Sequence, residues 1–146
     1  MTETARATVA NETETTTVSV DQDWTFDESH WPVLLVQAPP VVTARNWRKV
    51  FIDLEGYLLR PWPERKTFIT LEGGAPSVNQ AYSAAPFFIR NAGLMRSALH
   101  GWGLVLPSTR VQLPVKFMLW LTPLPVPTPI FDTTSEALKW AKLFYG

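Results

Sequence analysis

Cysteine is absent from this chain of 146 residues. Without a thiol, the protein can form no disulfide framework, no thiolate nucleophile and no sulfur-ligated metal site. The start of the sequence also lacks the basic and apolar segments of a secretory signal. The most apolar stretch, residues 111–130, contains five prolines and Lys116, a poor composition for a membrane-spanning helix. These features predict a soluble cytoplasmic protein without stable membrane insertion.

Negative charge is missing from a long central part of the chain. No carboxylate occurs between residues 73 and 131, where the cations are Arg90, Arg96, Arg110 and Lys116. Residues 1–23 hold five acidic side chains against Arg6, a balance of −4, so the remainder carries +4 in a chain of net charge zero. The cations are either solvated individually or form a basic face for an acidic protein or a phosphate group. They are too few and too scattered to indicate nucleic-acid binding.

The first half of the chain predicts a tail followed by alternating strands and helices. Residues 1–23 are rich in threonine and acid and poor in large apolar side chains, so we expect a flexible tail before a domain over residues 24–146. The apolar run 31–38, closed by two prolines, predicts a buried strand. A helix is predicted over residues 43–60, with Thr43 as its N-cap, and a second strand over residues 67–74.

The second half continues the alternation. Ser77 and Gln80 form a capping box that opens a helix running to Leu99, which Pro86 should kink or split. A strand is predicted over residues 101–108, then a strongly apolar helix-like segment over 109–125 and a short strand over 128–131. Thr133 and Glu136 cap a last helix. The sequence therefore predicts one α/β domain in the order β-α-β-α-β-α-β-α, with about four mostly parallel strands and about four helices.

The element order and the ending "IFDTTSEALKW" resemble the STAS domain, the sulphate-transporter and anti-sigma-factor-antagonist module. Divergent bacterial members carry a Trp-Pro pair in the opening strand, as Trp31 and Pro32 do here. The resemblance implies a STAS-like fold over about residues 30–145. Regulatory members place a phospho-accepting serine at a helix N-terminus, and Ser77 occupies that place. The neighbouring Asp and Gly of the family motif are absent here, so Ser77 is read either as an N-cap or as a phospho-switch.

Few residues suggest catalysis. His30 and His100 are far apart in sequence, and neither has a metal-ligand neighbour at helical spacing. The glycines at 73 and 74 lack the lysine and the spacing of a phosphate-binding loop. We therefore expect no catalytic residue, no metal and no cofactor.

The apolar surplus of the third and fourth quarters of the chain suggests binding. Some of its aromatic residues should point away from the sheet and form a protein interface with a basic rim. The predicted partner-binding residues are Phe88, Arg90, Arg96, Arg110, Lys116, Phe117, Met118 and Trp120. The sequence thus predicts a non-enzymatic interaction module of a bacterial regulatory or scaffolding assembly, with an acidic protein partner or a second copy of itself. The alternatives are a carrier of an apolar, lipid-like ligand in an internal cavity and a phospho-switch at Ser77.

Overall fold

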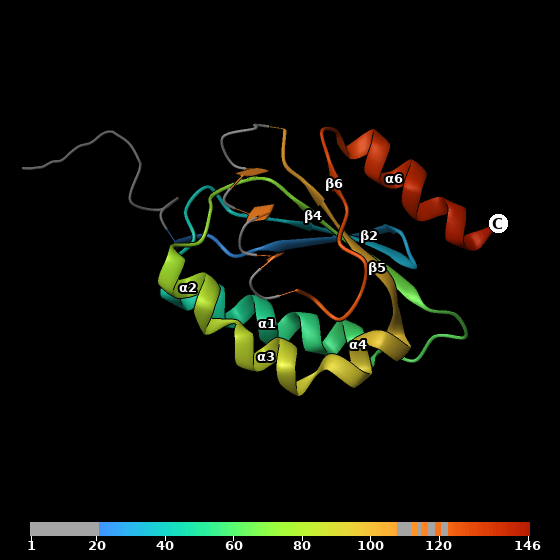
Figure 1. Cartoon of the computed structure of the whole chain (residues 1–146), viewed down its shortest axis with the longest axis horizontal. Helices are drawn as coiled ribbons and strands as arrows, with labels where there is room; N and C mark the ends of the chain where they lie inside the picture. Colours follow the sequence, from blue (N-terminus) through green and yellow to red (C-terminus); the bar gives the residue numbers. More distant parts are fainter. Residues whose placement is uncertain (1–20, 108–111, 114, 117–118, 121–122) are drawn as a thin grey trace, which may run out of the picture.

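The computed structural model describes residues 21–107, 112–113, 115–116, 119–120 and 123–146 (Figure 1). Five strands form one sheet in the order β2-β3-β4-β5-β6. The strands are β2 (Thr25–His30), β3 (Val33–Gln37), β4 (Lys66–Leu71), β5 (Leu99–Val105) and β6 (Ile130–Phe131). The pair β2–β3 is antiparallel, and the other neighbours are parallel. The predicted α/β fold with a mostly parallel sheet is confirmed, with five strands in place of four.

Helices cover both faces of this sheet. They are α1 (Ala44–Leu59), α2 (Val78–Ser83), α3 (Ala85–Arg90), α4 (Ala92–Ala98) and α6 (Thr134–Lys142), followed by a 3-10 turn, η2 (Leu143–Tyr145). Figure 1 shows α1 to α4 on one side of the sheet and α6 on the other. The larger core lies beneath α1, α3 and α4 around Phe68, Met95 and Trp102. A smaller core lies beneath α6, where Ala137 and Ala141 meet Ile69 and its neighbours.

The edge strand β2 was not predicted. Asp27, Glu28 and Ser29 make its sequence polar, and most of its side chains are exposed. Charged side chains are common on edge strands because they discourage pairing with another chain. The polar composition therefore gave no strand signal, although the backbone pairs regularly with β3 from Thr25 to Asp27.

Helix α1 begins at the predicted N-cap. The Thr43 hydroxyl accepts from the backbone N–H of Asn46 at 3.1 Å, and the Asn46 side-chain oxygen accepts from the Thr43 N–H at 2.9 Å. At the other end, the buried ammonium of Lys66 donates to the Leu58 carbonyl at 3.0 Å, which satisfies a free acceptor in the last turn. Burial lowers the pKa of Lys66 because it disfavours the charged form. The predicted helix is confirmed, and its apolar residues Val50, Leu54 and Leu58 are buried at helical spacing.

The helix predicted to open at Ser77 is divided into α2, α3 and α4. Pro86 lies in the first turn of α3, where its missing N–H leaves no hydrogen bond broken. The Ser77–Gln80 capping box is present at the start of α2, with both of its hydrogen bonds formed. The expected interruption at Pro86 is therefore confirmed, and a second break at Asn91 gives three short helices in this region.

The last helix packs closely on β5 because that strand carries two buried glycines. A Cβ atom at Gly101 would lie 3.0 Å from the ring of Trp140, and one at Gly103 would lie 3.1 Å from it. The Thr133 hydroxyl caps α6 by accepting from the Glu136 N–H at 3.1 Å. The predicted terminal strand and capped helix are thus present, and Trp140 lies where the glycines leave room.

Candidate functional site

An apolar cavity of about 240 Å³ lies between the sheet and α1. Its lining includes the ends of three strands. The lining residues are Val36 and Ala38 at the end of β3, Thr70 and Leu71 at the end of β4, and Leu104 on β5. These are the carboxyl ends of parallel strands, the edge at which α/β folds usually bind their ligands. The position and the apolar lining make this cavity the candidate binding site.

Five aromatic rings form much of the cavity wall: Trp24, Trp47, Phe51, Phe88 and Trp102. Each contacts the next along this series, with ring centroids 4.8 to 6.0 Å apart. All four contacts are tilted or edge-to-face, the geometry that aromatic quadrupoles favour. The wall therefore presents both ring faces and ring edges.

Two of the three indoles in this wall are held by hydrogen bonds. The Trp102 Nε1–H donates to the Thr70 hydroxyl at 2.8 Å, and the Trp47 Nε1–H donates to the Gln80 carbonyl at 2.8 Å. The Nε1–H of Trp24 is buried and finds no partner among the residues that the structure describes. A buried donor without a partner is uncommon, because it loses its hydration without compensation.

A glycine loop borders the same cavity. Gly73 and Gly74 follow β4 and pass directly over the segment after β3. A Cβ atom at Gly73 would lie 2.4 Å from the Ala38 carbonyl oxygen, and one at Gly74 would lie 2.4 Å from the Pro40 oxygen. The Gly74 N–H also donates to the Pro39 carbonyl at 2.6 Å. The loop can adopt this path because both positions lack a side chain.

Residues 21–23 are bonded to the first turn of α1, and Trp24 after them lines the cavity. The Arg45 guanidinium bonds to the carboxylates of Asp21 and Asp23, each at 2.7 Å, and these bonds are exposed. The first of them is the main reason that the pKa of the Asp21 carboxyl is lowered. The buried Asn46 amide donates to the Gln22 carbonyl at 2.8 Å. This end of the predicted tail is thus held against α1, and Trp24 follows it into the cavity wall.

The predicted partner-binding residues are distributed over several places. Phe88 is half-buried and packs against the larger core, so it belongs to the cavity wall. Arg90 and Arg96 are exposed, at the ends of α3 and α4. Lys116 and Trp120 are exposed in the helical residues that the structure describes between 112 and 120. Arg110, Phe117 and Met118 lie outside the described residues.

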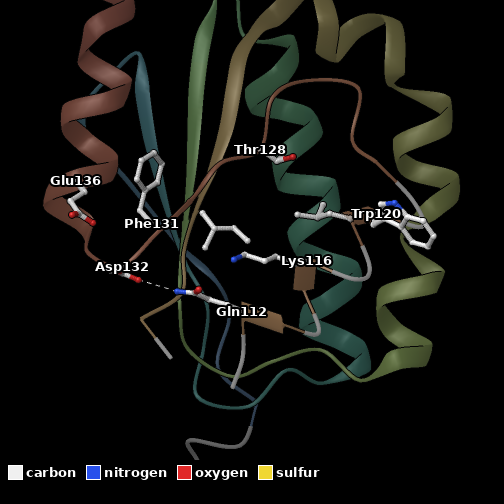
Figure 2. A pocket seen from close by; sticks show the side chains of 9 residues that line it. Gln112, Lys116, Trp120, Thr128, Phe131, Asp132 and Glu136 are labelled. Atoms are coloured by element: carbon white, nitrogen blue, oxygen red, sulfur yellow. Dashed lines mark hydrogen bonds between the residues drawn. The ribbon is translucent and has the colours of Figure 1, made fainter. Parts of the chain in front are cut away.

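Lys116 and Trp120 line a second, open groove of about 820 Å³ beside β6 (Figure 2). Asp132 and Glu136 lie on the opposite side of this groove. Figure 2 shows the Lys116 side chain extending into the groove toward that side. Gln112 donates to the Asp132 carboxylate at 3.0 Å and to the Leu106 carbonyl at 2.5 Å. The groove mixes both signs of charge, so it does not extend the predicted basic face.

Helices α2 and α3 carry exposed apolar side chains in the region of the predicted basic residues Arg90 and Arg96. Val78, Tyr82 and Ile89 are 66%, 52% and 76% exposed. Phe88 was predicted to be part of a partner-binding surface here, whereas the structure exposes Ile89 and packs Phe88 against the core. The apolar surface near Arg90 is therefore real, although its members differ from those predicted.

The other candidates from the sequence have local structural roles. The Ser77 hydroxyl caps α2 by accepting from the Gln80 N–H at 3.1 Å, and its phosphorylation stays a prediction. The His100 ring stacks on Phe144 with centroids 4.5 Å apart, and burial lowers its pKa. Within the described part of the chain, no group of three or more metal-ligating side chains comes together, and no helix is long and apolar enough to cross a membrane.

The strand order, the parallel core of the sheet and the capped terminal helix define a STAS-like α/β fold. The chain is similar in structure to an uncharacterized protein of the DUF3478 family, with a SpoIIAA-like fold, from Shewanella loihica PV-4. The TM-score is 0.58 at 14% sequence identity, over 81% of this chain and 91% of that one. No family model matches the sequence, and no curated protein matches it. The similarity confirms the predicted fold, and at this identity it carries the fold alone.

Proposed function

We propose that this protein is a non-enzymatic binding module that holds a small apolar molecule in the cavity between the sheet and α1. The observation that carries the proposal is an apolar cavity of about 240 Å³ at the carboxyl ends of three strands. The cavity is partly open, so a small molecule could enter it without unfolding of the core. Its lining is predominantly apolar with few polar groups, as is usual for small-molecule sites, and burying that lining against an apolar guest is favourable.

Filling the cavity from Leu104 should weaken this binding. Leu104 is half-buried, lies on β5 and lines the cavity. In Leu104→Phe the larger side chain occupies the space, so toluene should bind at least about fivefold more weakly, because overpacking costs about 1 kcal/mol or more. The measurement is an NMR titration with toluene, following the amide signals of Val36, Val50 and Leu54.

Leu59→Phe is the matched control, since Leu59 is 61% exposed on α1 and does not line the cavity. It should leave the toluene titration unchanged, and thermal melts should show that both variants fold. Equal toluene affinity in Leu104→Phe and wild type would contradict the proposal.

A second candidate function is docking of an acidic protein on α2 to α4. The exposed apolar residues Val78, Tyr82 and Ile89, with Arg90 and Arg96 beside them, favour it. Interfaces of this kind combine an apolar centre with a charged rim that steers association. A regulatory or scaffolding role in a bacterial assembly, or pairing with a second copy, would use this surface.

Charge reversal tests the second candidate. A partner retrieved from the native host by wild-type protein should be lost with Arg90→Glu/Arg96→Glu, because the reversed charges would repel its acidic surface. Lys139→Glu/Lys142→Glu on α6 is the control, since it changes the net charge by the same amount on exposed residues of the opposite face. Equal retrieval by both double variants and wild type would exclude this surface.

A further inference from the structure

The sheet side of the cavity is a row of three side chains across neighbouring strands. Val36 on β3 pairs in register with Thr70 on β4, and Thr70 pairs with Leu104 on β5. All three residues line the cavity. Along β4, Phe68 belongs to the core beneath α1, whereas Ile69 belongs to the core beneath α6. Because side chains alternate along a strand, Thr70 projects from the same face as Phe68, in the middle of this row.

The Thr70 hydroxyl makes one hydrogen bond and can make a second. Its oxygen accepts from the Trp102 Nε1–H at 2.8 Å, and no described residue accepts a hydrogen bond from its own O–H. A threonine hydroxyl can accept and donate at once, and accepting one bond makes it a better donor. Thr70 is half-buried although strands pair with β4 on both sides. Since the residue lines the cavity, its remaining exposed surface opens there.

We propose that the ligand is a compact, uncharged and largely apolar molecule with one hydrogen-bond acceptor, and that the Thr70 hydroxyl donates to this acceptor. The inference rests on the proposed function and specifies the chemical class that the same cavity takes. In the free protein, water can enter the partly open cavity and accept from Thr70. A wholly apolar guest displaces that water and leaves the O–H without an acceptor, whereas a carbonyl or ether oxygen keeps the bond.

The volume limits the size of this molecule. An apolar cavity of about 150 Å³ holds benzene, so a cavity of about 240 Å³ admits one ring with a short substituent. A long lipid chain would leave much of its length outside this space. The lipid-like ligand expected from the sequence is therefore narrowed to a compact one.

The charge of the lining disfavours an anionic acceptor. Glu72 is the one ionisable side chain among the described residues that line the cavity. A carboxylate or phosphate ligand would meet its negative charge with no lining cation to offset it, and burial of an unpaired charge is costly. A ketone, aldehyde or ether oxygen accepts the same hydrogen bond without that cost.

Two probes of nearly equal shape test the inference. Acetophenone carries a carbonyl oxygen, whereas α-methylstyrene has a methylene group in its place. Thr70→Val removes the hydroxyl and keeps the shape of the side chain, but it also releases the Trp102 N–H. The quantity to compare is therefore the ratio of the two affinities within each protein, measured by calorimetric titration. The preference for acetophenone should be about fivefold smaller in Thr70→Val than in wild type, the effect of one lost hydrogen bond.

Two further variants control this measurement. Thr70→Ser keeps a hydroxyl at the same position, so it should restore the wild-type ratio. Thr67→Val makes the same chemical change at a buried threonine of the same strand, whose hydroxyl bonds to Tyr145 and which does not line the cavity. It should leave the ratio unchanged, and thermal melts should show that all the variants fold.

Infrared spectroscopy of bound acetophenone reports the hydrogen bond itself. A donated hydrogen bond weakens the C=O bond and lowers its stretching frequency. The carbonyl band should therefore lie at lower frequency in wild type and Thr70→Ser than in Thr70→Val. A shift of the Trp102 ring alone would not produce this pattern.

The outcomes separate this inference from the proposed function. If Thr70→Val weakens both probes equally, if Thr70→Ser does not restore the ratio, or if the carbonyl band is the same in all three proteins, recognition by Thr70 is overturned while the cavity stays a binding site. The same holds if Thr67→Val reproduces the effect. If neither probe binds wild type and the amide signals of the cavity do not move, the proposed function fails, and this inference fails with it.

Discussion

Replacing Gly74 with alanine should destabilise the protein by about 3 kcal/mol, the upper part of the range for overpacking a closely packed site. The new Cβ would lie 2.4 Å from the Pro40 carbonyl oxygen and 2.8 Å from its carbon, far inside van der Waals contact. Both atoms belong to the backbone, so no side-chain rotation can relieve the overlap. The Gly74 N–H bond to the Pro39 carbonyl ties the two segments together and prevents their separation. Denaturant unfolding of wild type and Gly74→Ala measures the difference.

Gly93→Ala is the control for this prediction. Gly93 lies within α4 and is exposed, and a Cβ atom there would meet nothing within 4 Å. Alanine should therefore stabilise the helix by about 0.5–1 kcal/mol, because glycine loses more backbone entropy on folding. If Gly74→Ala unfolded at the same denaturant concentration as wild type, the two loops would not be in the contact described. Since the loop borders the cavity, Gly74→Ala should also weaken the binding of toluene.

The capped helices could be predicted because their signals are local. Thr43 and Ser77 each form the hydrogen bonds that a capping residue makes with its own first turn, and these bonds need no information from elsewhere in the chain. The apolar face of α1 follows from helical spacing in the same way. Pro86 was correctly read as an interruption because its ring and its missing N–H act on its immediate neighbours.

The cavity could not be predicted because its walls come from distant segments. Trp24, Gly73 and Leu104 meet only when the sheet forms, and no sequence spacing connects them. Trp24 stands where a polar segment gives way to a strand, which marks it as the first large apolar residue of the fold without saying what it contacts. Phe88 was predicted to bind a partner because this part of the chain holds more apolar side chains than a sheet needs, whereas in the structure it packs against the larger core.

The role of the two glycines of β5 also could not be predicted, because it depends on a residue distant in the sequence. Their residue type weakens the strand signal, since glycine packs no side chain and is disfavoured in strand interiors. The reason for Gly101 and Gly103 lies about 40 positions later, in the ring of Trp140 that rests on them. The capped start of α6 could be predicted from local residues, but the surface that receives the helix required the three-dimensional arrangement.

Asn46 joins the first turn of α1 to the segment that leads into Trp24. Its side chain is fully buried and makes three hydrogen bonds, accepting from the Thr43 N–H and donating to the Val41 and Gln22 carbonyls at 3.0 and 2.8 Å. Asn46→Ala would remove one half of the capping box and leave two backbone acceptors without this donor. We expect a loss of about 3 kcal/mol, from about 1 kcal/mol for the cap and about 2 kcal/mol for the unsatisfied groups.

The same substitution should also weaken ligand binding, because the Gln22 carbonyl lies two residues before Trp24. Releasing this carbonyl frees the segment that positions the Trp24 ring in the cavity wall, so toluene should bind more weakly to Asn46→Ala even where the variant is fully folded. Arg45→Ala is the comparison, since Arg45 holds the same segment through exposed bonds to Asp21 and Asp23 that water can replace. Thermal melts and toluene titrations should therefore show a large effect for Asn46→Ala and a small one for Arg45→Ala. Equal effects would mean that the surface bonds, and not the buried amide, hold Trp24 in the cavity wall.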